Sequence, residues 1–210
     1  MTAKHQHGQP SLFTSIEEVD LPNADIVIHR SLFDVQEADE HLEGLLFETH
    51  WQQEQIRMFG KMTDIPRLTA WYGDEDKPYT YSGIEMAPLP WTTRLETIKK
   101  QVESVSETTF NSVLLNRYRD GSDGVAWHAD NEPELGPAPI IGSVSFGATR
   151  AFQFRNITDS KENEMTEEVQ LRHGDVLIMG GGTQKYWNHQ IPKRTKADPR
   201  INLTFRKILS

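Results

Sequence analysis

The second half of the sequence is a series of short strand-like segments with no helical pattern between them. From Phe110 onward, apolar and polar residues alternate over short runs, and turns such as Asp120-Gly121 and His173-Gly174-Asp175 separate the runs. The expected strands cover residues 112–118, 140–146, 151–155, 166–171, 175–179, 187–191 and 200–207. Many strands without helices between them are typical of sandwiches and jelly rolls. We therefore predict an α+β, mainly β chain whose core, residues 110–210, is a double-stranded β-helix (jelly roll).

The first half is predicted to extend this core at its N-terminal side. Residues 1–24 mix polar residues without sustained periodicity, which indicates a loose N-terminal arm. Residues 25–109 begin with a strand at 25–28 and then provide two helices and several hairpins. A chain of 210 residues is long enough for one well-packed domain, so we expect a single functional unit overall.

Two amphipathic helices are expected in this extension. Asp34 and Glu37 have capping-box spacing, and leucines follow at helical intervals, so the first helix should cover residues 35–49. The second helix should begin near Thr92, after two prolines. Between the two helices, residues 51–83 break into short aromatic pieces separated by turns, which favours hairpins.

The composition excludes several kinds of site. The chain has no cysteine, so disulfides, thiolate metal sites and cysteine nucleophiles are excluded, and any metal must be bound by nitrogen and oxygen. The net charge of −9 argues against a broadly basic surface, so a nucleic-acid role would need a local patch. No apolar run approaches the roughly 20 residues of a membrane span, and the start of the chain lacks the apolar core of a signal peptide. We expect no membrane partner and a cytoplasmic protein, or a nuclear one in a eukaryote.

A histidine and a carboxylate lie two residues apart in His128-Ala129-Asp130. On an extended segment such residues point to the same side, so His128 and Asp130 can bind one metal ion. The third ligand is expected from His189, on a later strand-like segment. His173 is the alternative, and it is disfavoured because it lies in an expected surface turn. The remaining histidines precede residue 51, where solvated or packing roles are expected.

The strand expected at residues 200–207 separates polar from apolar residues. Its polar face consists of Arg200, Asn202, Thr204 and Arg206. A half-exposed strand with that face in water would show the same pattern. Inside a jelly roll the face would instead line a pocket, and two buried guanidinium groups would require anionic partners such as a dicarboxylate. Asn116 and Tyr118, on another expected strand, offer further donors to such a ligand, and a hydrogen-bonded core pair is the alternative for them.

Together these residues indicate a non-haem iron site. Two histidines and one carboxylate occupy one face of an octahedral Fe(II) and leave three positions, which a bidentate 2-oxo acid and O₂ can fill. The arginine-bearing strand makes the dicarboxylate 2-oxoglutarate the natural co-substrate. A zinc hydrolase is the alternative, but it leaves the paired arginines unexplained.

These residues resemble the AlkB family of Fe(II)/2-oxoglutarate-dependent dioxygenases over about residues 55–207. The matching motifs are Asn116-x-Tyr118, His128-x-Asp130, His189 and Arg200-x-Asn202-x-Thr204-x-Arg206. The resemblance implies that His128, Asp130 and His189 bind the iron. It also implies that Arg200 holds the distal carboxylate of 2-oxoglutarate and that Arg206 lies near its keto-acid end. The co-substrate site would be completed by Asn116, Tyr118, Asn202 and Thr204.

Within the family, the resemblance is closest to members that repair alkylated bases in duplex DNA. It is carried by Phe59-Gly60-Lys61, Pro66-Arg67, Tyr72-Gly73-Asp74 and Tyr79-Thr80-Tyr81-Ser82-Gly83. The residues implied to contact a flipped base or its DNA are Phe59, Gly60, Lys61, Arg67, Tyr79, Thr80, Tyr81, Asn131 and Glu132. For the two tyrosines, strand packing is the alternative.

The resemblance therefore predicts oxidative demethylation of N-alkylated bases, of the 1-methyladenine and 3-methylcytosine type, in duplex or single-stranded DNA. The reaction would use Fe(II), O₂ and 2-oxoglutarate and release formaldehyde, succinate and CO₂. RNA, a protein side chain or a small molecule are alternative substrates, and a non-catalytic nucleic-acid-binding module is the alternative of a different class. We expect a monomer whose DNA-binding charge is local. The candidate basic residues are Lys193, Arg194 and Lys196, with Arg57, Lys61 and Arg67.

Overall fold

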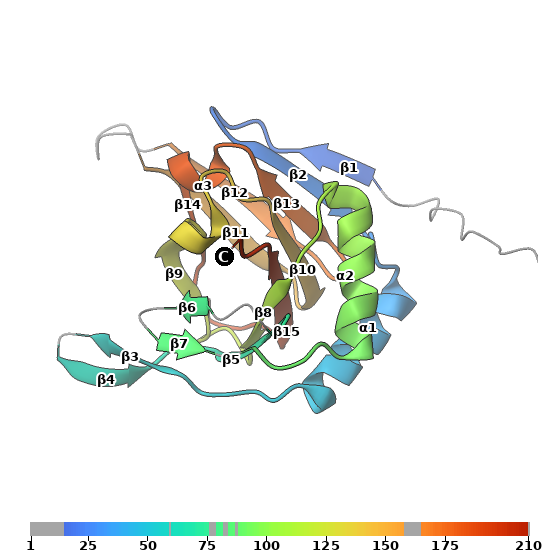
Figure 1. The fold of residues 1–210 in the computed structure, drawn as a ribbon, viewed down its shortest axis with the longest axis vertical. Coiled ribbons are helices and arrows are strands. Elements are labelled where there is room, and N and C mark those ends of the chain that lie inside the picture. The colour runs from blue at the N-terminus through green and yellow to red at the C-terminus, as the bar shows by residue number, and fades with distance from the viewer. Residues whose placement is uncertain are drawn as a thin grey trace, which may run out of the picture.

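The computed structural model describes residues 15–58, 60–75, 79–81, 84–86, 88–157 and 165–209 (Figure 1). Its largest element is a seven-stranded antiparallel sheet with the strand order β1-β2-β13-β10-β15-β8-β5. In that order the strands are β1 (Ser15–Glu18), β2 (Asp25–Arg30), β13 (Val176–Gly180), β10 (Ile141–Gly147), β15 (Arg200–Arg206), β8 (Ser112–Tyr118) and β5 (Leu68–Gly73). The strand β15 therefore lies in the interior of the sheet, between β10 and β8.

A second antiparallel sheet has the order β12-β11-β14-β9. Its strands are β12 (Thr166–Leu171), β11 (Arg150–Asn156), β14 (Trp187–Ile191) and β9 (Val125–His128). Buried side chains of both sheets, such as Leu177 of β13 and Phe154 of β11, form one apolar cluster between them. The two sheets thus face each other in the predicted jelly-roll arrangement, with helices on one outer side.

The other face of the large sheet is covered by the helices α1 (Val35–Glu48) and α2 (Thr93–Ser106). Leu45 of α1 and Val102 of α2 pack with the buried Leu203 and Phe205 of β15 in a second apolar cluster. The predicted capping box of α1 is present, because Asp34 accepts from the Glu37 N–H while Glu37 accepts from the Asp34 N–H. The approach of α2 to the sheet is close: a Cβ added to Gly142 would lie 2.7 Å from a Val102 methyl group.

Two small hairpins extend from this body on the side away from the helices (Figure 1). One pairs β3 (Gln55–Met58) with β4 (Lys61–Asp64), and the other pairs β6 (Tyr79–Tyr81) with β7 (Ile84–Met86). The hairpins predicted between the two helices are therefore confirmed. Two short helical turns complete the fold, the 3₁₀ turn η1 (Pro133–Leu135) and the single-turn helix α3 (Thr183–Tyr186).

The structure differs from the sequence prediction at the N-terminal side. Residues 15–18, expected in a loose arm, form the edge strand β1, and the nearby Leu21 is buried in the core between the sheets. All four residues of β1 are exposed, so no buried face marks the strand in the sequence. The segment 68–73 is also part of the large sheet rather than a hairpin. That sheet consequently takes strands from each of the three ranges distinguished in the sequence.

Candidate metal centre and co-substrate cavity

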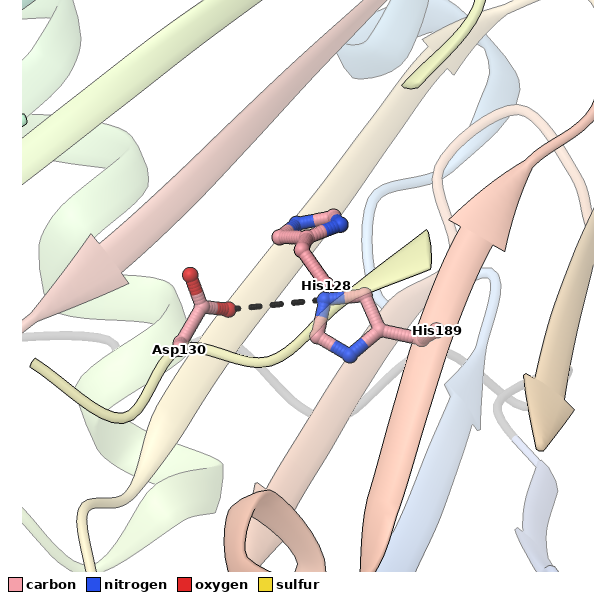
Figure 2. A group of neighbouring side chains, drawn as sticks. All are labelled: His128, Asp130 and His189. Atoms are coloured by element: carbon pink, nitrogen blue, oxygen red, sulfur yellow. Dashed lines mark ion pairs between the residues drawn. The ribbon is translucent and has the colours of Figure 1, made fainter. Parts of the chain in front are cut away.

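The predicted metal ligands converge at one end of the four-stranded sheet (Figure 2). His128 is the last residue of β9, and the antiparallel register places it directly opposite His189 of β14. Asp130 follows two residues after His128, beyond the end of the strand. One ligand atom from each of the three side chains can be chosen so that all lie within 4.8 Å of one another, and among the described residues this is the only such group found. His173 lies elsewhere, with Nδ1 accepting from the Gly147 N–H at 2.8 Å.

Hydrogen bonds and packing fix the orientation of both histidine rings. Nδ1 of His128 lies 2.8 Å from the Ala126 carbonyl oxygen, which leaves Nε2 for a metal. The His189 ring stacks on Phe152 with a centroid distance of 5.1 Å. Its Nε2 lies 3.6 Å from Oδ2 of Asp130. Each histidine therefore presents Nε2 toward the same small volume.

The electrostatics of the group favour the deprotonated forms of Asp130 and His189. Burial by itself would raise the pKa of the Asp130 carboxyl, but the electrostatic interactions with Arg206, His189 and His128 and the hydrogen bond from Arg206 outweigh it and hold that pKa well below its usual range. Burial, assisted by the electrostatic interaction with His128, lowers the pKa of His189 to about 3 against the opposing effect of Asp130. A deprotonated carboxylate and a neutral imidazole are the forms that bind a metal ion.

A cavity between the two sheets extends from this group to β15. It is lined by the three candidate ligands and by every residue predicted for the co-substrate, namely Asn116, Tyr118, Arg200, Asn202, Thr204 and Arg206. All seven residues of β15 are buried, and the apolar ones pack toward the helices. The polar face of β15 therefore points into the cavity, and the half-exposed alternative is wrong.

Arg200 is the side chain in this cavity that most needs an anion. It is 1% exposed, and its Nη2 donates to the Ser145 hydroxyl at 2.8 Å while the Tyr118 ring lies 5.2 Å from its Cζ. Among the described residues, its Nε and Nη1 have no hydrogen-bond partner and no carboxylate pairs with it. Burial lowers the pKa of Arg200 to about 10, so the group stays charged at neutral pH. A buried, charged guanidinium with unused donors fits a ligand carboxylate.

Arg206 lies at the metal end of the same cavity. It pairs with Oδ1 of Asp130, and both side chains are almost fully buried. The two arginines thus mark opposite ends of the polar face of β15. Such an arrangement suits an elongated dianion, with one end near the histidines and the other at Arg200.

The remaining polar residues form hydrogen bonds with one another. Asn202 donates to the Ser143 hydroxyl at 2.8 Å and to the Val144 carbonyl at 2.9 Å, and Thr204 donates to Asn202 at 3.1 Å. Ser143 and Ser145 were missed in the sequence, although they alternate on β10 opposite Thr204 and Asn202. Their alternation is visible in the sequence, but only the pairing of β10 with β15 shows that they lie beside Asn202 and Thr204.

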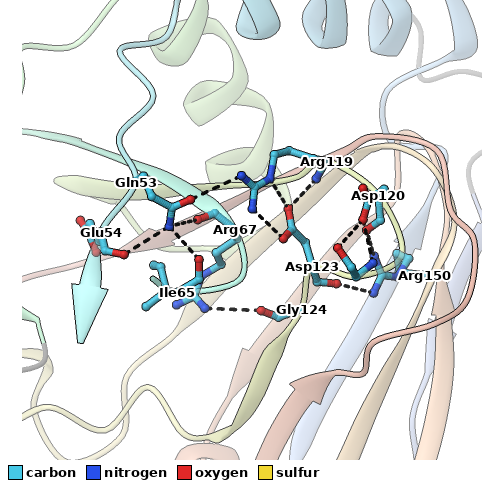
Figure 3. A network of polar contacts seen from close by, with 10 residues as sticks. Gln53, Glu54, Ile65, Arg67, Arg119, Asp120, Asp123, Gly124 and Arg150 are labelled. Atoms are coloured by element: carbon cyan, nitrogen blue, oxygen red, sulfur yellow. Dashed lines mark hydrogen bonds and ion pairs between the residues drawn. The ribbon is translucent and has the colours of Figure 1, made fainter. Parts of the chain in front are cut away.

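Arg67 occupies a different place from the one expected. It was predicted to contact DNA, but it is 5% exposed and lines the cavity. Its Nε donates to Asn116 Oδ1 at 2.7 Å. Its Nη1 donates to the Gly124 carbonyl at 3.5 Å (Figure 3). Gln53 donates to the carbonyls of Ile65 and Arg67, and it also contacts Arg119. These hydrogen bonds connect the segment between β4 and β5 to the wall of the cavity.

The other predicted substrate contacts are near the cavity or on the hairpins. Asn131 is exposed beside Asp130, and Glu132, which precedes η1, has an Oε2 that is buried without a partner among the described residues. Gly60 and Lys61 are exposed on the first hairpin, and Tyr79, Thr80 and Tyr81 form β6. Phe59 lies outside the described residues.

Among the basic candidates, Lys193, Arg194 and Lys196 are exposed between β14 and β15, and Arg57 is exposed on β3.

Comparison with known proteins gives one consistent result. The sequence profile of the 2OG-Fe(II) oxygenase superfamily matches residues 25–206. Human alpha-ketoglutarate-dependent dioxygenase alkB homolog 3 is 45% identical over 194 residues, which are 87% of this chain and 66% of that protein. Human DNA oxidative demethylase ALKBH2 is 43% identical over 187 residues, which are 85% of this chain and 71% of that protein.

Structural comparison agrees at the level of the fold. The solved structure of OsALKBH1 superposes with a TM-score of 0.62 at 16% identity and covers 92% of this chain and 100% of that one. The chain spans about two thirds of the length of the alkB homolog 3 proteins that it matches, with 66% coverage of the mouse protein. Within the described part of the chain, no helix has the length and apolar composition of a membrane span.

Proposed function

The chain belongs to the AlkB family within the 2OG-Fe(II) oxygenase superfamily, and from that premise we propose that it oxidatively demethylates N-alkylated bases in DNA. The observation that carries the proposal is the buried Arg200, which has no carboxylate partner among the described residues and lies in the same cavity as His128, Asp130 and His189. A metal group alone is compatible with several chemistries. A metal group beside a cationic dicarboxylate pocket favours a 2-oxoglutarate-dependent oxygenase.

The three ligands have distinct tasks in this proposal. His128 and His189 provide neutral nitrogen donors, and Asp130 provides the anionic oxygen. Bound Fe(II), with O₂ and 2-oxoglutarate, supplies the oxidation in which an N-methyl group is hydroxylated and lost as formaldehyde while 2-oxoglutarate becomes succinate and CO₂. Two histidines and one carboxylate leave coordination positions open, as that chemistry requires.

Residues of β15 and β8 would hold the co-substrate. Arg200 would pair with the distal carboxylate of 2-oxoglutarate, and Tyr118 would cover the guanidinium. Arg206 would lie near the keto-acid end, since it already contacts Asp130. Asn116, Asn202 and Thr204 would line the space between these ends. The buried side chains of Leu114, Phe152 and Ile191 line the same cavity and would exclude water from it.

The DNA side of the site would be formed by the hairpins and two loops. Asn131 and Glu132 adjoin the metal ligands and would contact the flipped base. The exposed basic side chains of Lys61, Lys193 and Lys196 would contact phosphates. Such a local patch is compatible with a net charge of −9. We also propose that the protein acts as a monomer, in the cytoplasm or in the nucleus of a eukaryote, where its substrate is located.

One turnover assay separates the candidate functions. The purified chain with Fe(II), 2-oxoglutarate and O₂ is given oligonucleotides bearing 1-methyladenine or 3-methylcytosine, single-stranded or duplex, and matched methylated RNA. Succinate and formaldehyde that form only with methylated DNA support the proposal. Stimulation by RNA alone would favour an RNA demethylase. A lack of succinate with every oligonucleotide would favour an oxygenase with a protein or small-molecule substrate, or a non-catalytic module.

A further inference from the structure

The single-turn helix α3 carries a buried glutamine that contacts the metal group. Gln184 is 2% exposed, and α3 lies in the short connection between β13 and β14, the strand that bears His189. The helix is held in place by Thr183, whose hydroxyl donates to the Gly180 carbonyl at 2.6 Å and accepts from the Asp25 N–H at 3.0 Å. Gln184 therefore extends from a well-anchored turn.

The carboxamide of Gln184 contacts the backbone of Asp130. Its Oε1 accepts from the Asp130 N–H at 2.9 Å, and its Nε2 lies 3.6 Å from the sulfur of Met179. Asp130 lies beyond the last residue of β9, so the pairing of β9 with β14 does not fix its backbone. The buried Gln184 oxygen takes over that task, in a place where an unpaired N–H would be unfavourable.

Two side chains from different elements thus determine where the Asp130 carboxylate points. Arg206 of β15 holds Oδ1 from one side, and Gln184 holds the backbone from another. Oδ2 is then directed toward His189, as Figure 2 shows. We propose that Gln184 is a positioning residue for the metal, because it joins the segment that carries His128 and Asp130 to the one that carries His189. The proposal rests on the metal-dependent function proposed above.

Loss of the Gln184 oxygen that accepts from Asp130 should lower the affinity for the metal more than the stability of the fold. Side chains that orient metal ligands typically contribute about 10- to 100-fold to metal affinity. Gln184→Met keeps the length and bulk of the side chain but removes the accepting oxygen. Gln184→Glu keeps an accepting oxygen and removes the amide donor, so it separates the bond to Asp130 from the contact with Met179. Gln101→Met, at a half-buried glutamine on α2 away from the cavity, is the matched control.

The test titrates metal-free protein with Co(II) alone in a calorimeter, after circular dichroism and thermal unfolding of each variant. We expect the dissociation constant of Gln184→Met to rise about 10- to 100-fold, while Gln184→Glu and Gln101→Met stay within about three-fold of the parent chain. Gln184→Asn, which shortens the side chain and retracts the oxygen, should lose about as much as Gln184→Met and replaces it if that variant does not fold.

Three outcomes would overturn the inference. Unchanged Co(II) affinity in a folded Gln184→Met or Gln184→Asn variant, with only the melting temperature lowered, would leave Gln184 a packing residue. An equal loss in Gln184→Glu would assign the effect to the amide donor instead of the acceptor. A parent chain that binds no Co(II) would overturn the proposed function together with this inference, so the two failures are distinguishable.

Discussion

Arg206 and Asp130 form an ion pair in which both side chains are 3% exposed, although 76 positions separate them in the sequence. A buried carboxylate without such a partner would tend to take up a proton. The pair therefore keeps Asp130 anionic before any metal arrives. It also links the metal centre directly to β15, the strand that carries Arg200, so Asp130 and Arg200 are both held by that strand.

The metal ligands give the first prediction. His128→Ala, Asp130→Ala and His189→Ala should each abolish turnover, because removing one of three ligands weakens the metal and changes its geometry. His173→Ala is the control, since that ring contacts Gly147 instead. Turnover and Co(II) binding should fail together in the first three variants only. A dead His173→Ala enzyme beside an active His189→Ala enzyme would refute the assignment.

The second prediction concerns the co-substrate. Arg200→Ala should weaken 2-oxoglutarate binding by about 2–5 kcal/mol, since removing one partner of a buried charge pair leaves the other unpaired. The apparent KM for 2-oxoglutarate measures the loss, and excess co-substrate should restore activity only in part. Arg94→Gln, which breaks a pair between α1 and α2 with Glu48, should leave that KM unchanged. An unaltered KM in Arg200→Ala would place the co-substrate elsewhere.

The third prediction separates two kinds of basic residue. The double change Lys193→Gln and Lys196→Gln should weaken DNA binding and reduce the salt dependence of log K by about 0.9 for each phosphate that the variant no longer neutralises. Arg67→Gln should instead affect the co-substrate, because Arg67 is buried in the cavity against Asn116. Fluorescence anisotropy at several salt concentrations measures the slopes. A reduced salt dependence of log K in Arg67→Gln would instead indicate that Arg67 contacts a DNA phosphate.

The fourth prediction concerns Phe59, which lies outside the described residues and is argued from the sequence alone. An inserted aromatic can fill the gap left by a flipped base and offset an unstacking cost of a few kcal/mol. Phe59→Ala should therefore reduce repair of a methylated duplex far more than repair of the same single strand. Phe47→Ala removes a phenylalanine that is 83% exposed on α1 and should alter neither. Equal losses on both substrates, with a lower melting temperature, would make Phe59 a packing residue.

The fifth prediction is a pH dependence of folding. Burial lowers the pKa of His29, His41 and His189 in the folded protein. The unfolded chain takes up protons at these positions near pH 6.5 and the folded chain does not, so the free energy of unfolding should decrease as the pH falls below that value.

Urea unfolding of the metal-free protein at about pH 7.5 and about pH 5 measures this loss. His41→Gln should lose less stability than the parent chain over the same interval, because Gln does not titrate. His41 suits the test since it packs against Phe33 and Phe146, away from the metal group. An identical loss in both proteins would contradict the assigned direction for His41.

Much of the site was readable from local patterns, and the remainder depends on long-range contacts. The alternation in β15 and the spacing of His128 and Asp130 are properties of single segments. The residues that these two patterns mark do line the cavity, as predicted. The burial of Arg67 could not be predicted, because its partner, Asn116, is 49 positions away and the local sequence resembles that of a surface hairpin. Gln184 left no pattern, since its helix has only four residues. The strand β1 was missed because its stability comes from β2 and not from a buried face.

The interior position of β15 also determines how the site responds to thermal fluctuations. Its residues are buried throughout and its backbone is paired on both sides, whereas β1 and β5 lie at the edges of the sheet. Amide hydrogens in such a strand exchange with solvent only through openings that approach global unfolding, while those at sheet edges exchange through small local ones. Arg200 and Arg206 are consequently attached to the part of the backbone that should exchange most slowly, and fraying of the sheet edges leaves the spacing between the two guanidinium groups intact.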